Sequence, residues 1–386
     1  MKILMPFYYQ QFKCIGDSCP DTCCKDWKIP IDVKAWDKYQ KLEGSLGKKV
    51  RESISTENGI SFKLEKDGSC PLLNQEKLCE LVLQMGEDFL CTTCATYPRF
   101  SRLNGDVGEC GLSLSCPEVA RILLSIKEPI DFCFSDNGEE ISLNPQIDYS
   151  LYNDLLTARR ISIDIAQNRN LEIWERLFVL CMFNQKIQNT LSDSKISDRS
   201  HILCQYDRIE YIEQMVLEVQ RISFSEEEQF KVRLNLAECF WNNFSGQLGV
   251  YKNIFEKHTK KQTEEEIIRK YVRAGKEFSV YYKVRSHEYE NFIVYWLFRY
   301  YMQSVGDKVL YKNIEMLVLV YTVMRFLALW QWLDNGKELT IQNQEQIFWK
   351  CSRSIEHDSK SYDELHHALV DAELNNIGYM LLLCKD

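Results

Sequence analysis

The chain has 386 residues, of which 45% are apolar and 27% are charged, and its formal net charge is −9 with a pI near 5.4. This length can bury a large core and accommodate two or three domains, and the composition is that of a globular protein. The acidic charge argues against a general nucleic-acid-binding protein, which is usually basic.

The N-terminal stretch does not resemble a secretion signal. Its short apolar run is broken by Pro6, and it lacks the longer apolar core and small-residue cleavage site of a signal peptide. We therefore expect a cytoplasmic protein, in which a dense disulfide framework is uncommon because the compartment is reducing. Clustered cysteines in such a protein more often bind metal or take part in chemistry.

Residues 1–148 are predicted to form a loop-rich cysteine domain with short helices and minor β-structure. All eight prolines lie at or before Pro145, and proline breaks helix interiors. A helix is predicted to begin near Asp32. The stretch GISFKLEKDGSCPLL, residues 59–73, predicts a short strand or hairpin with a turn at Asp67-Gly68. Because such a domain has little continuous core, bound metal would supply the missing cross-links.

Eleven of the sixteen cysteines lie in this first region, and the ten between Cys14 and Cys116 are the predicted metal ligands: Cys14, Cys19, Cys23, Cys24, Cys70, Cys79, Cys91, Cys94, Cys110 and Cys116. Local spacings such as Cys91-x2-Cys94 can fix part of a metal site. All six histidines lie at or after His201, so we expect an all-thiolate site. Such a site suits zinc or iron–sulfur, and the residues alone do not decide between the two.

Residues 149–386 are predicted to form an all-helical domain of eight or nine helices, which makes the fold mainly α. Ser225, Thr263 and Ser361 are each followed three residues later by glutamate, as in capping boxes at helix N-termini. The apolar segment 314–333 is long enough to cross a bilayer, but charged residues interrupt it. We expect a buried core helix there and no membrane insertion.

Three cysteine-containing motifs carry a resemblance. CIGDSCPDTCCKDWKIPID, CPLLNQEKLC and CTTCATYPRFSRLNGDVGECGLSLSCPEVAR together resemble the flagellin lysine N-methylase family. The first motif also resembles a wider group of CxxCxxCC-type zinc- or iron-chelating proteins. The resemblance covers residues 7–125 through motifs, and the helical remainder through length and character only.

The resemblance implies a protein-lysine N-methyltransferase with flagellin as its protein substrate. It also implies S-adenosylmethionine as the methyl donor and a cysteine-ligated [4Fe–4S] cluster, with zinc as the alternative metal. The cysteines shared with the wider group correspond to Cys19, Cys23, Cys24, Cys70, Cys79 and Cys94. The other four are typical of the methylase branch.

Two common routes to S-adenosylmethionine chemistry do not fit the sequence. Radical enzymes usually carry Cys-x3-Cys-x2-Cys, and here Cys19-x3-Cys23 is followed by Asp26 at the third position. The chain also has no G-x-G-x-G loop after a strand, so a Rossmann-type methyltransferase is unsupported. The donor site is therefore expected to differ from both.

Polar residues inside the third motif are the candidate catalytic and donor-binding residues. Lysine methylation needs a neutral amine, so Tyr97 and Glu109 are the catalytic candidates. Arg99 could bind the donor's carboxylate in a bidentate manner. The remaining predicted donor-binding residues are Ser113, Ser115 and Glu118. Arg99 and Glu109 could instead form salt bridges that support the metal site.

A function of another class also fits the cysteine pattern. The chain could be a non-enzymatic metal-binding protein that serves in storage, delivery or assembly of metal. Binding of S-adenosylmethionine would separate this alternative from the enzyme.

Overall fold

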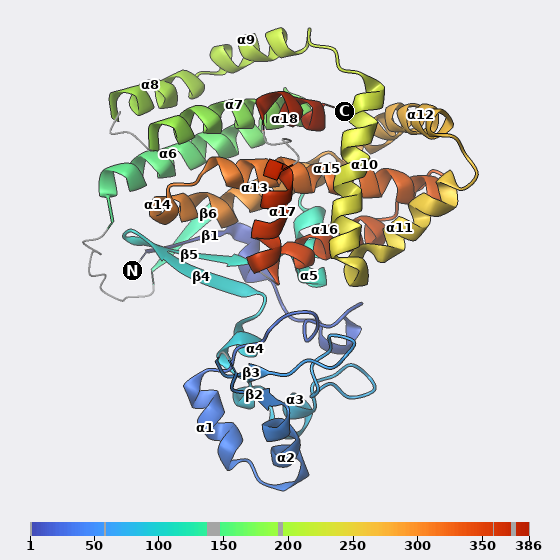
Figure 1. Ribbon diagram of the computed structural model, residues 1–386. Coiled ribbons are helices and arrows are strands. Elements are labelled where there is room, and N and C mark those ends of the chain that lie inside the picture. The colour runs from blue at the N-terminus through green and yellow to red at the C-terminus, as the bar shows by residue number, and fades with distance from the viewer. Residues whose placement is uncertain are drawn as a thin grey trace.

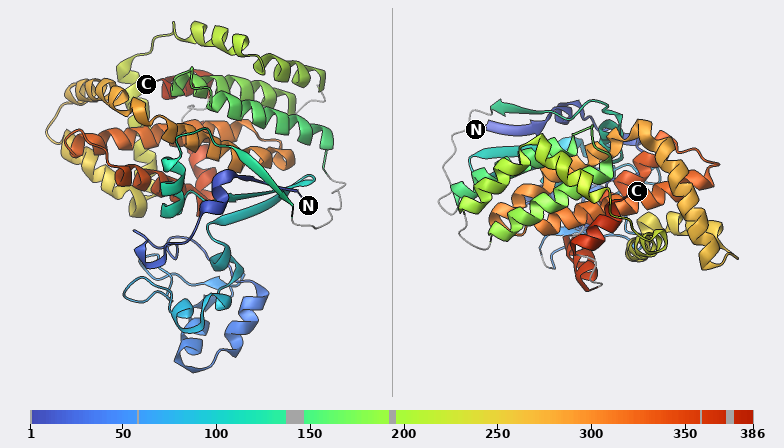
Figure 2. Two further views of the ribbon diagram at one scale, coloured as in Figure 1. Left: turned by 180° about the vertical axis from the view of Figure 1, so that it is seen from behind. Right: turned by 90° about the horizontal axis from the view of Figure 1, so that it is seen from above.

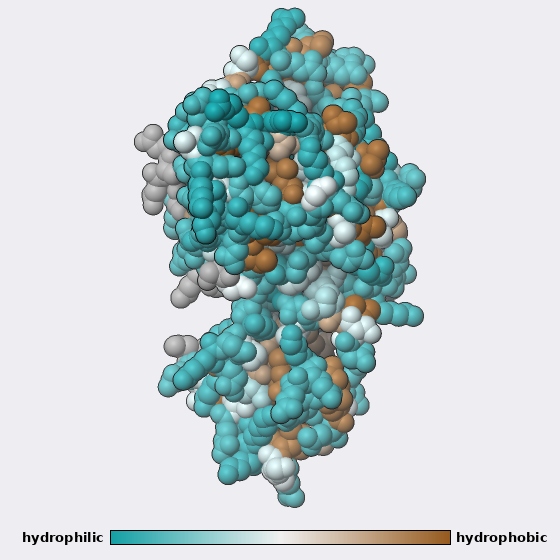
Figure 3. All heavy atoms as spheres, turned by 90° about the vertical axis from the view of Figure 1, so that its right-hand side faces the viewer, coloured by the Kyte–Doolittle hydropathy of each residue, from teal (hydrophilic) through white to brown (hydrophobic). Residues whose placement is uncertain are grey.

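The computed structural model describes residues 2–57, 59–136, 147–191, 196–357, 359–371 and 376–385. A large helical part lies above a smaller lobe (Figure 1), and the molecule narrows between them (Figure 3). We call residues 14–98 the cysteine lobe and the remainder the helical body. The fold is mainly α, as predicted.

The cysteine lobe consists of short elements. They are η2 (Gly16–Ser18), α1 (Val33–Lys41), α2 (Gly44–Glu52), β2 (Ile54–Ser55), β3 (Ser61–Phe62), α3 (Glu80–Met85), η3 (Glu87–Phe89) and α4 (Thr92–Thr96). The Asp32 carboxylate accepts a hydrogen bond from the Ala35 N–H and caps α1, which confirms the predicted helix start. β3 lies within the stretch predicted to form a strand or hairpin, but it pairs with β2, which precedes that stretch, and not across the turn that forms at Gly68, whose φ is 82°.

A four-stranded sheet belongs to the helical body and lies along one side of its helices (Figure 2). Its strands are β1 (Lys2–Pro6), β4 (Arg99–Asn104), β5 (Val107–Leu112) and β6 (Phe132–Asp136), in the order β4-β5-β1-β6. β4 and β5 form an antiparallel hairpin, while β1 runs parallel to β5 and antiparallel to β6. None of these four strands was predicted from the sequence. At the hairpin turn, Gly105 has a φ of 60°, and an added Cβ would lie 2.7 Å from the Tyr152 ring.

The remaining elements of the helical body are helices. They are η1 (Phe7–Gln11), α5 (Pro117–Ser125), α6 (Tyr149–Ala166), α7 (Ile173–Leu191), α8 (Ile196–Tyr206), α9 (Ile209–Val219), α10 (Glu226–Asn243), α11 (Ser245–Thr259), α12 (Glu264–Tyr282), η4 (Lys283–Arg285), α13 (His287–Tyr300), η5 (Tyr301–Gln303), α14 (Ser304–Asp307), α15 (Tyr311–Asp334), α16 (Ile341–Glu356), α17 (Ser359–Asp371) and α18 (Ile377–Cys384). The described residues after 148 thus form thirteen α-helices, more than the eight or nine predicted.

Two of the three predicted capping residues are confirmed. The Ser225 hydroxyl accepts a hydrogen bond from the Glu228 N–H before α10, and Thr263 with Glu266 forms a complete capping box before α12. α17 begins at Ser359 instead, so Ser361 lies inside this helix rather than before it. The prediction for Ser361 is therefore wrong, because the helix begins two residues earlier.

The predicted apolar core helix is α15. Among the described helices it is the one long and apolar enough to cross a membrane, and 89% of its most apolar window is buried inside the protein. It packs against α7, α10, α11 and α16. The prediction of a buried core helix is confirmed.

The described residues form two separate hydrophobic cores. The smaller core lies within the cysteine lobe, between Ile29 and Cys91. The larger core joins Tyr8 and Phe12 to the segment from Leu112 to Ile130 and to the later helices. The cores separate near residue 98, whereas the predicted domain boundary lies at 148/149. Residues 99–136 belong with the helical body because α5 packs against α13 and α16.

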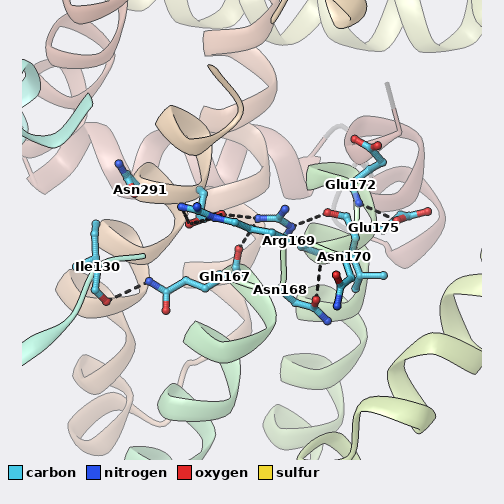
Figure 4. A network of polar contacts seen from close by, with 12 residues as sticks. Ile130, Gln167, Asn168, Arg169, Asn170, Glu172, Glu175 and Asn291 are labelled. Carbon is cyan, nitrogen blue, oxygen red and sulfur yellow. Dashed lines mark hydrogen bonds and ion pairs between the residues drawn. The ribbon is translucent and has the colours of Figure 1, made fainter. Parts of the chain in front are cut away.

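The turn between α6 and α7 is fixed by polar contacts (Figure 4). The Gln167 side chain donates to the Ile130 carbonyl at 3.1 Å, and Arg169 donates to Glu290 on α13 at 2.8 Å. Arg176 on α7 contacts the other Glu290 oxygen, also at 2.8 Å. Because Glu290 is almost fully buried between two guanidinium groups, this turn holds α13 in place beside α7.

Candidate functional site

Six of the predicted cysteine ligands form one group in the cysteine lobe: Cys23, Cys24, Cys70, Cys79, Cys91 and Cys94. The thiols of Cys23 and Cys24 are hydrogen-bonded to each other, and so are those of Cys91 and Cys94. A negative charge on Cys70 or Cys79 raises the pKa of Cys24, which places these thiols within electrostatic range. Thiols from three separate segments of the sequence therefore lie within electrostatic range of one another, and we call this set the inner cysteines.

Backbone hydrogen bonds bring these segments together. The Cys70 N–H donates to the Cys24 carbonyl at 2.8 Å, and Leu73 forms a β-bridge with Cys79. Cys79 precedes α3 and Cys91 precedes α4 as N-cap residues. Each sulfur at these caps faces unsatisfied backbone N–H groups, which favour a negative charge.

The environment of the buried thiols fits a bound metal. Burial raises the pKa of Cys70 to about 11 and that of Cys116 to about 12, while nearby backbone N–H groups lower both in part. Amide donors aimed at a buried sulfur stabilise a thiolate, but here they do not outweigh desolvation. A metal cation would supply the missing positive charge and deprotonate the thiol.

The other predicted ligands divide into two sets. Cys19 lies near Cys14, Cys116 and Cys23, and we call Cys14, Cys19 and Cys116 the outer cysteines. Cys110 lies apart on β5, where its thiol interacts with the Tyr9 hydroxyl. Across the described ranges, no three cysteine, histidine or carboxylate side chains approach one point closely enough to hold a single ion.

Arg353 on α16 connects the helical body to the outer cysteines. Its guanidinium is 2.6 Å from the Asp21 carboxylate, which lies between Cys19 and Cys23, and it donates to the Ser115 carbonyl at 3.1 Å. It also lies 4.5 Å from the centre of the Trp349 ring. The positive charge of Arg353 helps to lower the pKa of Cys23. Sequence reasoning missed this residue because nothing in the sequence pairs it with the cysteines.

Three predicted site residues do come together. The Tyr97 hydroxyl lies 3.0 Å from the Ser115 hydroxyl, which lies 2.5 Å from the Ser113 hydroxyl. Ser113 donates in turn to Glu356 at the end of α16. Glu356 also accepts from Tyr295 and lies 3.4 Å from Arg299. This hydrogen-bonded chain extends from the cysteine lobe into the helical body.

The Tyr97 hydroxyl holds its proton strongly. Burial raises the pKa of Tyr97 well above its usual value, and a negative charge on Cys116 would raise it further. At neutral pH, Tyr97 can therefore donate a hydrogen bond but cannot accept a proton from an ammonium group. Its catalytic role stays a prediction, now restricted to hydrogen bonding.

The other three predicted polar residues have different surroundings. The Glu109 carboxylate is buried and lies 2.5 Å from Arg159 on α6 and 3.2 Å from Arg102. Arg99 donates to the Phe12 carbonyl at 3.3 Å and lies over the Phe12 ring. Glu118 pairs with Arg121 at 2.6 Å. Each of these groups already has a partner within the protein.

An aromatic cluster lies at the junction between the cysteine lobe and the helical body. The ring centres of Trp27 and His357 are 5.0 Å apart, and Tyr97 lies 5.6 Å from Trp27. The Trp27 indole N–H donates to the Cys23 carbonyl at 2.7 Å. Burial and the positive charge of Arg353 lower the pKa of His357 to about 3. Sequence reasoning missed His357 because it lies far from the cysteines in the sequence.

A cavity of about 420 Å³ lies beside the outer cysteines, between the cysteine lobe and the helical body. Its walls include Ile15, which follows Cys14, Pro20, which follows Cys19, and Pro117, which follows Cys116. The opposite wall is the N-terminal half of α16. Figure 1 shows α5 and α16 on the side of the helical body that faces the lobe.

Comparison with known proteins places this chain in a family. The model of the FliB lysine N-methylase C-terminal domain matches residues 159–383, which is more than half of the chain. The chain belongs to the FliB lysine N-methylase family. Family membership confirms the resemblance that the cysteine motifs indicated, and it does so through the helical body, where no motif had been recognised.

Individual relatives match over shorter regions. The flagellar biosynthetic protein FliU of Salmonella muenchen is 31% identical over 131 residues, which are 31% of this chain and 75% of that protein. A lysine-N-methylase of Salmonella typhimurium and one of Salmonella choleraesuis are each 30% identical over 127 residues, covering 31% of this chain. The chain spans about a third of the length of these two family members, 32% in each case. No solved structure matches the chain significantly.

Proposed function

We propose that this chain is a cytoplasmic, S-adenosylmethionine-dependent protein methyltransferase that N-methylates lysine side chains of flagellin. The observation that carries the proposal is the family match over residues 159–383, because the family is described as lysine N-methylases. The flagellar substrate is supported by a relative described as a flagellar biosynthetic protein. Two further relatives are named lysine-N-methylases.

We further propose that the cysteines hold a [4Fe–4S] cluster, with zinc as the alternative metal. The inner cysteines supply more thiols than the four that a cubane cluster needs. Their buried thiols with amide donors suit either metal. When bound, the metal would cross-link the loops of the cysteine lobe, whose own hydrophobic core is small.

In methyl transfer, the residues of this chain have to bind and orient the two reactants. The reaction needs a lysine amine that has lost its proton and a methyl group on a sulfonium donor held in line with it. The junction between the two parts of the protein offers buried hydrogen-bonding groups at Tyr97, Ser113 and Ser115. These groups can orient a bound donor and exclude water from it.

The direct test is mass spectrometry of purified flagellin after incubation with anaerobically purified protein and S-adenosylmethionine. We expect added methyl groups on lysine residues, and none when the donor is omitted. Calorimetry with metal-replete protein should show binding of S-adenosylmethionine. Absence of both methylation and donor binding would favour the non-enzymatic metal-binding protein instead.

A further inference from the structure

We propose that the cavity beside the outer cysteines receives the substrate lysine side chain, and that Glu345 binds the lysine ammonium group and accepts its proton. This inference rests on the proposed function and names the position at which the substrate enters. The cavity has a volume of about 420 Å³, which is ample for one extended lysine side chain. It lies between the cysteine lobe and the helical body, where the molecule is narrowest (Figure 3).

The cavity lies beside the loops that carry the outer cysteines. Three of its wall residues directly follow the outer cysteines in sequence: Ile15, Pro20 and Pro117. A side chain that enters between the lobe and α16 would therefore lie beside the loops that carry these cysteines.

The carboxylates in the cavity wall are not equivalent. Asp21 is neutralised by Arg353 at 2.6 Å, and Glu118 by Arg121 at 2.6 Å. For Glu345, the described part of the chain supplies no ion pair or hydrogen bond within contact distance. Its carboxylate lies half-buried in the wall, so a ligand cation is the partner that would complete its environment.

The rest of the wall suits an alkylammonium group. Trp349 contributes an aromatic ring, and the amides of Gln342 and Gln346 contribute further hydrogen-bonding groups. Lys350 also belongs to the wall, but its ammonium lies over the rings of Tyr251 and Trp349, at 6.0 Å and 5.6 Å from their centres. The wall therefore combines apolar and aromatic surface with one available carboxylate, while its two cations, Arg121 and Lys350, contact Glu118 and the Trp349 ring. Such a wall can take the butyl chain and the charged end of lysine.

Glu345 is also suited to accept a proton. Burial raises the pKa of its carboxyl group, and the nearby Glu118 raises it further, while Arg121 opposes this change. Transfer of one proton from the lysine ammonium to Glu345 leaves a neutral amine and a carboxylic acid. The amine's electron pair then forms the N–C bond to the donor methyl group as the C–S bond breaks, and the S–C electron pair stays on the sulfur.

The test compares two glutamate variants in the full-length, metal-replete protein. Glu345→Gln removes the cavity carboxylate with little change in shape, and Glu338→Gln removes an exposed carboxylate just before α16. Calorimetry measures binding of a short capped peptide that contains one lysine. The same peptide with norleucine in place of lysine reports any contribution from the peptide backbone.

We expect Glu345→Gln to weaken binding of the lysine peptide about ten-fold or more, because a charge-assisted hydrogen bond in a partly buried site is lost. Glu338→Gln should bind like the natural protein, and the norleucine peptide should bind weakly to all three. Equal binding of the lysine peptide by Glu345→Gln and Glu338→Gln would overturn the proposal. So would failure of the natural protein to prefer lysine over norleucine.

Two readouts separate this inference from the proposed function. If flagellin is methylated equally by the natural protein and by Glu345→Gln, the lysine site is wrong while the methylase function stands. If lysine binding depends on Glu345 but no methylation occurs with any variant, the cavity is a lysine site and the methylase function is wrong. Glu345→Asp, which restores a carboxylate on a shorter side chain, should recover part of the binding if charge is the cause.

Discussion

Arg353 contacts Asp21 at 2.6 Å across 332 positions of the sequence, and this ion pair joins the last third of the helical body to the first cysteine loop. Arg353 is almost fully buried, and it also donates to the Ser115 carbonyl. One side chain thus touches both the loop that carries Cys19 and Cys23 and the segment that precedes Cys116. The position of the cysteine lobe therefore depends on α16.

Replacing Arg353 by alanine should destabilise the protein strongly. The change leaves the Asp21 carboxylate and the Ser115 carbonyl without their partner, and breaking a buried ion pair costs about 3–5 kcal/mol. Chemical denaturation measures the effect. Arg160→Ala is the control, because Arg160 forms exposed ion pairs with Asp164 and Asp207 and should cost about 1 kcal/mol or less. Similar losses in both variants would contradict the role assigned to Arg353.

Replacing Cys79 or Cys94 by serine should abolish metal binding. Both thiols belong to the inner cysteines, and without metal the small core of the cysteine lobe should lose stability. Elemental analysis of anaerobically prepared protein measures iron and zinc. We expect about four irons per chain for one cubane cluster. Stoichiometric zinc with negligible iron would mean that the iron–sulfur proposal is wrong.

Cys351 and Cys204 provide the controls for this experiment. Cys351 is fully buried in α16 and Cys204 is exposed on α8, and neither belongs to the inner or outer cysteines. Their alanine variants should keep the metal content of the natural protein. Equal metal loss in the control and the Cys79 variants would indicate general unfolding, and the ligand assignment would lose its support.

His357 should make the protein less stable as the pH falls from about 6.5 toward 3. Its pKa in the folded protein is about 3, against an ordinary value of 6.5. In this range the unfolded chain binds a proton that the folded protein does not, so stability decreases with falling pH, by up to about 1.4 kcal/mol per pH unit. Denaturation curves at several pH values measure the slope.

The variant His357→Phe isolates this contribution. Phenylalanine keeps a ring beside Trp27 and Tyr97 but cannot bind a proton. The difference in stability between pH 6.5 and pH 4 should therefore be smaller in this variant than in the natural protein. The same replacement at the exposed His201 serves as the control. An unchanged slope in His357→Phe would show that the folded protein does bind a proton there.

Local sequence signals predicted local structure well. Capping residues such as Asp32, Ser225 and Thr263 act through contacts within three residues, so the sequence contains everything that they need. The cysteine motifs likewise indicated the family. The hairpin of β4 and β5 was not predicted although Asn104-Gly105 is a strong turn signal, because Phe100 and Leu103 before the turn do not alternate with a period of two residues.

The candidate site depends on contacts that are not local in sequence. Arg353, Glu356 and His357 lie at the end of α16, and the packing of α16 against α5 brings them to the cysteines. No spacing or motif connects these residues to Ser113 or Tyr97 in one sequence. The same limit explains Glu109, whose proximity to the cysteines in sequence suggested chemistry while the fold pairs it with Arg159.

A variant of Glu109 can distinguish the two roles that the sequence allowed for this residue, a catalytic base and a salt-bridge residue. Its carboxylate lies between Arg159 and Arg102, so Glu109→Gln would leave two guanidinium groups facing each other in a largely buried place. We expect a loss of about 3–5 kcal/mol in the free energy of unfolding. Methyl transfer per folded molecule should change little, because the carboxylate is already engaged by both arginines. A folded variant of near-normal stability whose methyl transfer falls about a hundred-fold would instead establish Glu109 as a catalytic base, since proton transfer by a positioned side chain contributes effects of that size.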